Sequence, residues 1–257
     1  MDILSHKNYR ELLDYLPTIK QTLKEWQLVD VRLLDEDEGF TVARAAALLQ
    51  NLFKERDGKI YLCNDNDIFM LIRWGQANHP QQIARRIEAT LPPGSCLVEV
   101  QQPTSDGLQK LVVKIKMGQA PEGSDASRRV RRRENVVLVA DDDMYMRTLV
   151  KKGIAAQATL YEVDNGREVI AAYKKYQPDV LFLDIHLPGK TGTEILTDLM
   201  NADPDAYVIM FSSDSSKDNV ELAMQQGARG FMTKPFSREK LMEYLKKCPT
   251  FLSVQAS

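Results

Sequence analysis

Residues 136–143 read VVLVADDD, and this stretch decides the fold of the C-terminal half of the chain. An unbroken apolar run ends abruptly in three acids. Such a run is typical of a strand that is buried on both faces of a parallel sheet. The acids then lie at the carboxyl end of the strand, where open α/β sheets bind their ligands.

Three more apolar runs end in polar groups. We expect strands at residues 180–184, 207–211 and 230–233, which deliver Asp184, Ser212 and Lys234 to the same edge. Amphipathic helices are expected between and after the strands, at residues 146–154, 168–176, 194–200, 217–226 and 238–247. The helix at 168–176 follows the turn Asp164-Asn165-Gly166, which ends a further strand. Strand and helix therefore alternate five times, which predicts an α/β fold with a doubly wound, five-stranded parallel sheet.

Residues 135–250 resemble the receiver domain of two-component response regulators. The resemblance is carried by five motif positions in family order: the acidic pair Asp141 and Asp142, the phospho-accepting Asp184, the hydroxyl residue Ser212, and Lys234 before Pro235. It implies a flavodoxin-like sheet with strand order 2-1-3-4-5 and a pocket at the switch point. Asp143 is expected to cap the helix that follows.

The carboxylates would repel one another without a cation, and oxygen-rich sites of this kind suit Mg²⁺. The expected ligands are Asp142, Asp184 and the backbone carbonyl of His186, with Asp141 acting mostly through a water. Asp184 is then the nucleophile that accepts a phosphoryl group. The oxygens of that group would be held by Ser212 and Lys234.

The resemblance also implies partners and a switch. A histidine kinase or phosphotransfer protein would donate the phosphoryl group, and a downstream protein would respond. Phe231 stands where receivers place a switch aromatic, and a core strand residue is an equally good interpretation. No enzymatic activity is expected beyond phosphorylation and dephosphorylation of the receiver itself.

The composition limits the class of protein. The chain has 257 residues, a net charge of −2 and a pI near 6.0, which argue against a bulk nucleic-acid binder. Its three cysteines share no close spacing and indicate a reducing compartment. With neither a long apolar run nor a signal peptide in the sequence, we expect a cytoplasmic protein and no membrane partner.

The sequence predicts an interaction domain at residues 1–118, a linker at 119–134, the receiver at 135–250 and a tail at 251–257. The linker contains an arginine run, Arg128–Arg133. We favour a solvated, charge-repelled segment over a nucleic-acid patch, because no aromatic residues or helix-turn-helix pattern accompany the run.

The N-terminal half opens with apolar residues at heptad-like spacing: Tyr9, Leu12, Leu16, Ile19, Leu23 and Trp26. We favour a helix packed on its own domain over a dimerising coil, because the seam is short and contains Pro17. A strand at 29–33, a helix at 41–54, strands at 59–63 and 68–73, and a helix at 80–91 follow. Residues 96–100 and 111–117 look like a closing hairpin. The expected order is βαββα followed by one strand or two, which is a ferredoxin-like α+β plan.

Residues 48–72 faintly resemble the GGDEF domain of diguanylate cyclases. The residues in place of the Gly-Gly-Asp-Glu-Phe signature are Asp65, Asn66, Asp67, Ile68 and Phe69. Asp67 and Phe69 match, whereas both glycines and the glutamate are missing. Ile68 cannot bind a metal, so the domain is expected to be inactive as a cyclase.

Three functions compete. The leading hypothesis is a response regulator whose receiver controls protein–protein contact or homodimerisation through residues 1–118. The second is a nucleotide sensor, for cyclic di-GMP or GTP, or a cyclase-type enzyme that uses the N-terminal domain. The third is a DNA-binding regulator that uses the arginine run.

Overall fold

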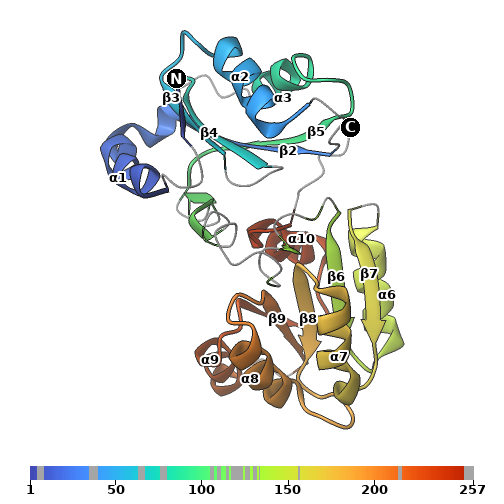
Figure 1. Cartoon of the computed structure of the whole chain (residues 1–257). Helices are drawn as coiled ribbons and strands as arrows, with labels where there is room; N and C mark the ends of the chain where they lie inside the picture. Colours follow the sequence, from blue (N-terminus) through green and yellow to red (C-terminus); the bar gives the residue numbers. More distant parts are fainter. Residues whose placement is uncertain are drawn as a thin grey trace. The chain divides into compact units, whose positions relative to one another are not determined.

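The structure is a computed structural model. It describes residues 1–4, 9–34, 40–62, 67–75, 80–104, 107–108, 111–113, 116, 124, 128–129, 132, 134–155, 157–213 and 216–251. The chain divides into two compact units, with the division between Pro121 and Glu122. Figure 1 shows the helices and strands of both units.

The N-terminal unit is built on a mixed sheet. Its elements are β1 (Asp2–Leu4), α1 (Tyr9–Ile19), the 3₁₀ helix η2 (Lys20–Glu25), β2 (Trp26–Leu33), α2 (Val42–Leu52), β3 (Gly58–Leu62), β4 (Asp67–Arg73), α3 (Pro80–Glu88) and β5 (Cys96–Gln101). The strand order is β1-β3-β4-β2-β5, and every pairing except β1 with β3 is antiparallel. The order from β2 to β5 is βαββαβ, as the expected plan requires; the ferredoxin-like assignment stays a prediction.

Helices cover both faces of this sheet, because successive side chains of β2 point alternately into two hydrophobic cores. Val29 and Val31 pack into a cluster that includes Ala45 and Leu49 of α2 and Ile83 of α3. Trp26 and Leu28 of β2 point to the other face of the sheet. There they form a second cluster with Leu16 and Ile19 of α1 and Leu23 of η2. Leu16, Ile19 and Leu23 of the heptad-like seam therefore pack on their own unit.

Two expectations for this half are wrong. Trp26 is the first residue of β2, paired with Arg73, because α1 ends at Ile19 and Thr22 has non-helical backbone angles. Leu111–Val113 are helical instead of extended, and Leu111 is buried in the cluster with Trp26. A short apolar run fits a strand or a helix equally well, and packing decides between them.

The C-terminal unit holds the predicted parallel sheet. Its elements are β6 (Val136–Ala140), α6 (Met144–Ile154), β7 (Thr159–Val163), α7 (Gly166–Tyr176), β8 (Val180–Asp184), α8 (Gly192–Ala202), β9 (Val208–Ser212), α9 (Lys217–Gln225), β10 (Gly230–Thr233) and α10 (Arg238–Lys247). The order is β10-β9-β8-β6-β7, and all four pairings are parallel. This confirms the doubly wound sheet with strand order 2-1-3-4-5.

Both faces of the inner strands β6, β8 and β9 are buried, as their apolar sequences require. Val137 and Val139 of β6 face a core that includes residues of α6 and α10. Leu138 and Ala140 face a second core with residues of α7, α8 and α9. The strands can therefore offer polar groups only at their ends, and this brings the functional side chains together.

The arginine run is not simply a solvated segment. Arg129 is 2% exposed, and Arg132 forms an ion pair with the buried Asp179. Both belong to the C-terminal unit. The expectation of a solvated run is therefore wrong for these two residues.

Within the described part of the chain, no helix is both long and apolar enough to span a membrane.

Candidate functional site

Three carboxylates gather at the carboxyl ends of β6 and β8. Asp141 and Asp142 directly follow β6, and Asp184 is the last residue of β8. One carboxylate oxygen from each lies within 4.8 Å of the others. Asp141 and Asp184 are buried, whereas Asp142 is exposed, so the cluster opens to solvent on one side.

Lys234 connects two of these acids. Its ammonium nitrogen lies 2.7 Å from a carboxylate oxygen of Asp141 and 3.0 Å from one of Asp184. Lys234 directly follows β10, and its backbone N–H donates to the carbonyl of Ser212 at 2.8 Å. Burial lowers the pKa of Lys234, but hydrogen bonds and charges from the two aspartates outweigh burial and raise the pKa overall.

The charge on Asp141 is costly where it lies. Burial raises the pKa of Asp141 above its usual value, and the opposing effect of Lys234 does not cancel the increase. One oxygen accepts a hydrogen bond from the backbone N–H of Asp143 at 3.0 Å. Asp143 is the expected N-cap of α6 and accepts from the backbone N–H of Tyr145 at 2.8 Å. A divalent cation would relieve the unfavourable charge at Asp141.

Two residues that support the acidic loop were not predicted. Arg147 donates to the backbone carbonyls of Asp141 at 2.7 Å and Asp142 at 3.2 Å. Gly192 lies against Asp184, where a Cβ on residue 192 would be 2.1 Å from the carbonyl oxygen of Asp184. Arg147 lies six residues after Asp141 on an amphipathic helix, and Gly192 opens α8, so neither position gave a distinct signal.

The remaining predicted site residues occupy different environments. Ser212 is the last residue of β9 and is buried, whereas the side chain of His186 is exposed. Phe231 lies on β10 and packs partly buried against the core that includes α8 and α9. Its backbone carbonyl accepts a hydrogen bond from the Tyr244 hydroxyl at 2.8 Å. Both interpretations of Phe231, core residue and switch aromatic, are compatible with this placement.

The cluster fits a hard divalent cation. It offers carboxylate oxygens within coordinating reach of one another, and one of its acids is open to solvent. Magnesium prefers oxygen ligands and keeps several waters, so an open side suits it better than a closed cage. The described residues that fit are Asp141, Asp142 and Asp184.

Comparison with known proteins agrees with this geometry. The pattern of the response regulator receiver domain matches residues 137–246. The chemotaxis protein CheY of Listeria monocytogenes is 36% identical over 113 residues, which are 43% of this chain and 95% of CheY. The chain belongs to the response regulator receiver family.

Other similar proteins match about the same share of this chain. CheY of Thermotoga maritima is 34% identical over 43% of this chain and 94% of its own length. Among solved structures, a CheX–CheY–BeF₃–Mg²⁺ complex from Borrelia burgdorferi has 26% identity and a TM-score of 0.42, covering 43% of this chain and 86% of the matched one. The N-terminal unit precedes the residues matched by the family pattern.

The GGDEF-like positions in the N-terminal unit have a structural explanation. Asp67 is fully buried, and one of its carboxylate oxygens lies 2.6 Å from Nε of the buried Arg32. The other oxygen accepts from Nη2 of Arg32 at 3.2 Å. Ile68 and Phe69 are buried strand residues, and Asp65 and Asn66 lie outside the described residues. Asp67 thus neutralises an arginine in the interior.

A hollow in the N-terminal unit is lined partly by charged residues, including Asp2, Lys59 and Arg73. Lys59 is paired with Asp2, and Arg73 with Glu25 at 2.6 Å. Because Lys59 and Arg73 are each paired with an acid, these two cations do not by themselves indicate an anion site.

Proposed function

We propose that the protein is a phosphorylation-dependent switch in which Asp184 accepts a phosphoryl group from a histidine kinase or phosphotransfer protein. The observation that supports this most strongly is the contact of Lys234 with both Asp141 and Asp184, beside an exposed Asp142. The arrangement supplies an acceptor carboxylate, a fixed positive charge and an opening to solvent.

In the proposed reaction, a carboxylate oxygen of Asp184 attacks phosphorus. The bond from phosphorus to the donor's leaving atom breaks, and the leaving group takes the bonding electron pair. Lys234 then moves its charge from the carboxylate to a phosphoryl oxygen, while the hydroxyl of Ser212 donates to another. Asp141, Asp142, Asp184 and the backbone carbonyl of His186 would hold Mg²⁺, which supplies positive charge for the crowded anions.

Phosphotransfer to Asp184 can be tested with a small phosphodonor and Mg²⁺. Wild-type protein should be labelled stoichiometrically, and Asp184→Asn should not be labelled, because an amide is not a nucleophile under these conditions. Asp218→Asn is the control, since Asp218 is an exposed acid on α9 outside the cluster. Stoichiometric labelling of Asp184→Asn would refute the assignment.

We further propose that the N-terminal unit is the output, acting through contact with a target protein or a second copy of the chain in the cytoplasm. The engagement of Asp67 by Arg32 supports this over cyclase chemistry or metal-dependent nucleotide binding. The engagement of Arg129 and Arg132 within the C-terminal unit weighs against a DNA-binding role for the arginine run.

Sedimentation of the full chain with and without beryllium fluoride, a phosphoryl mimic, tests the homodimer form of this output. A change in sedimentation that Asp184→Asn abolishes is the expected result. Production of a cyclic dinucleotide from GTP and Mg²⁺ would instead overturn the non-catalytic output.

A further inference from the structure

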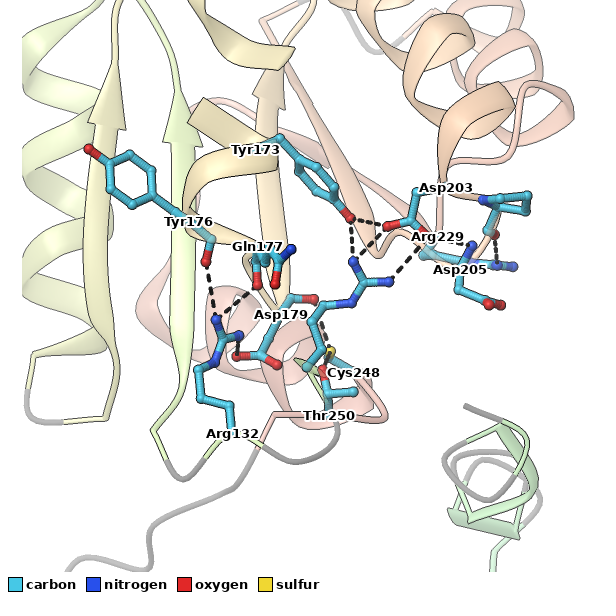
Figure 2. Close-up of polar contacts among 12 residues, drawn as sticks. Arg132, Tyr173, Tyr176, Gln177, Asp179, Asp203, Asp205, Arg229, Cys248 and Thr250 are labelled. Carbon is cyan, nitrogen blue, oxygen red and sulfur yellow. Dashed lines mark hydrogen bonds and ion pairs between the residues drawn. The ribbon is translucent and has the colours of Figure 1, made fainter. Parts of the chain in front are cut away.

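The arginine run, outside the candidate phosphorylation site, makes a specific contact that the proposed function does not use. The guanidinium of Arg129 forms two hydrogen bonds with Asp203, 2.6 Å from Nη1 to Oδ2 and 3.2 Å from Nη2 to Oδ1. Nη1 also donates to the Tyr173 hydroxyl at 2.9 Å, and that hydroxyl donates to Asp203 at 2.8 Å. Tyr173 comes from α7 and Asp203 caps the end of α8, as Figure 2 shows.

Arg132 makes a second contact nearby. It donates to the backbone carbonyls of Tyr176 at 3.1 Å and Gln177 at 2.9 Å, and its Nη2 lies 2.7 Å from Asp179 (Figure 2). Gln177 ends α7 in a left-handed conformation, with φ of 47°. Carbonyls at a helix C-terminus lack partners within the helix and carry partial negative charge, so a guanidinium suits this place.

These contacts differ from ordinary surface pairs. The side chain of Arg129 is 2% exposed, and that of Asp203 is 11% exposed. Burial raises the pKa of Asp203, but the hydrogen bond and charge of Arg129 outweigh burial and lower the pKa overall. A buried, bidentate arginine–carboxylate pair fixes geometry, and loss of one partner leaves a buried charge uncompensated.

We propose that Arg129 and Arg132 act as a strap that fastens the end of the interdomain linker to the receiver at α7, α8 and the start of β8. The strap also withholds the charges of Arg129 and Arg132 from nucleic acid. This inference rests on the contacts around Asp203 and Asp179 and is independent of phosphorylation at Asp184.

Limited trypsin digestion of the full chain tests the strap, because trypsin cuts after arginine only where the backbone is accessible. Asp203→Asn keeps every trypsin site and removes the charge that holds Arg129. A guanidinium without its carboxylate is better solvated in water than buried, so the strap should detach more often. We expect cleavage within residues 128–133 to accelerate about tenfold, since proteolysis follows the population of the open form.

Asp205→Asn is the matched control, because Asp205 is exposed and lies two residues away. Its cleavage rate should equal that of the wild type. Trypsin cleavage at other sites of the receiver measures global unfolding and separates it from local detachment of the strap. If Asp203→Asn unfolds the receiver, Tyr173→Phe, which removes only the bridging hydroxyl, should accelerate cleavage of the run by a few fold.

Equal cleavage of the run in wild type, Asp203→Asn and Tyr173→Phe would overturn the strap. The strap would also be overturned if trypsin cleaved residues 128–133 of the folded wild-type protein as fast as it cleaves them in the urea-unfolded protein.

Discussion

The ammonium nitrogen of Lys234 lies 3.0 Å from a carboxylate oxygen of Asp184. The strands that precede these residues belong to one parallel sheet, in which β9 separates β8 from β10. Lys234 therefore reaches across the mouth of the sheet to Asp184 and also contacts Asp141. Lys234 pairs with two of the three clustered carboxylates, so the stability of the site should depend on charge balance.

Replacement of Lys234 by methionine tests this balance. Without metal, Asp141 and Asp184 would lose their shared cation, and we expect the free energy of unfolding of the receiver to fall by about 2 kcal/mol. Added Mg²⁺ should restore part of the loss by binding the freed carboxylates. Urea unfolding with and without Mg²⁺ measures both effects; a loss that Mg²⁺ leaves unchanged would contradict the charge argument.

The raised pKa of Asp141 predicts a pH dependence with a definite sign. The folded state holds the proton on this acid more tightly than the unfolded state, whose pKa is near 3.8. The protonated Asp141 therefore contributes fully to the free energy of unfolding below the unfolded-state pKa. This contribution is lost as the pH rises through the higher folded-state pKa. At pH 7 without metal, the ionised Asp141 is therefore destabilising.

Asp141→Asn should accordingly raise the melting temperature of the metal-free protein at pH 7. The advantage should shrink as the pH falls through the raised folded pKa, and it should be gone once the pH is below the ordinary aspartate pKa. The variant should also gain less stability from Mg²⁺ than the wild type, because one candidate ligand is lost. Thermal unfolding across pH measures this, and a lower melting temperature for the variant at pH 7 would contradict it.

The buried pair of Arg32 and Asp67 predicts non-additive stability effects in the N-terminal unit. Asp67→Asn or Arg32→Met alone should cost about 3–5 kcal/mol, because each leaves one buried charge uncompensated. The double variant that combines these two substitutions should cost less than the sum of the single changes. Urea unfolding of the wild type and the three variants gives the coupling; strict additivity would argue against a direct pair.

The sheet of the receiver could be predicted because its physical signals are local. The strands other than β7 are apolar runs of strand length, and a polar residue such as Asp184 or Lys234 ends or directly follows each run. Since parallel strands point the same way, these ends had to meet at one edge. The convergence of Asp141, Asp142, Asp184 and Lys234 followed from that rule together with the family resemblance.

The errors came from contacts between residues far apart in sequence. Arg129 belongs to an arginine run whose composition is typical of a solvated segment. Its burial depends on Tyr173 and Asp203, which lie 44 and 74 residues away in the sequence. Trp26 continues a helical spacing, yet its pairing with Arg73 places it in a strand. Local periodicity does not encode these partners, so tertiary packing overrode it.

The most direct test of the central claim is to locate the phosphoryl group chemically. After phosphorylation by a small phosphodonor and Mg²⁺, borohydride reduces an aspartyl phosphate to homoserine, which mass spectrometry of the peptides can locate. We predict homoserine at position 184 and none at positions 141 or 142. Homoserine at another aspartate, with residue 184 unchanged, would contradict the account.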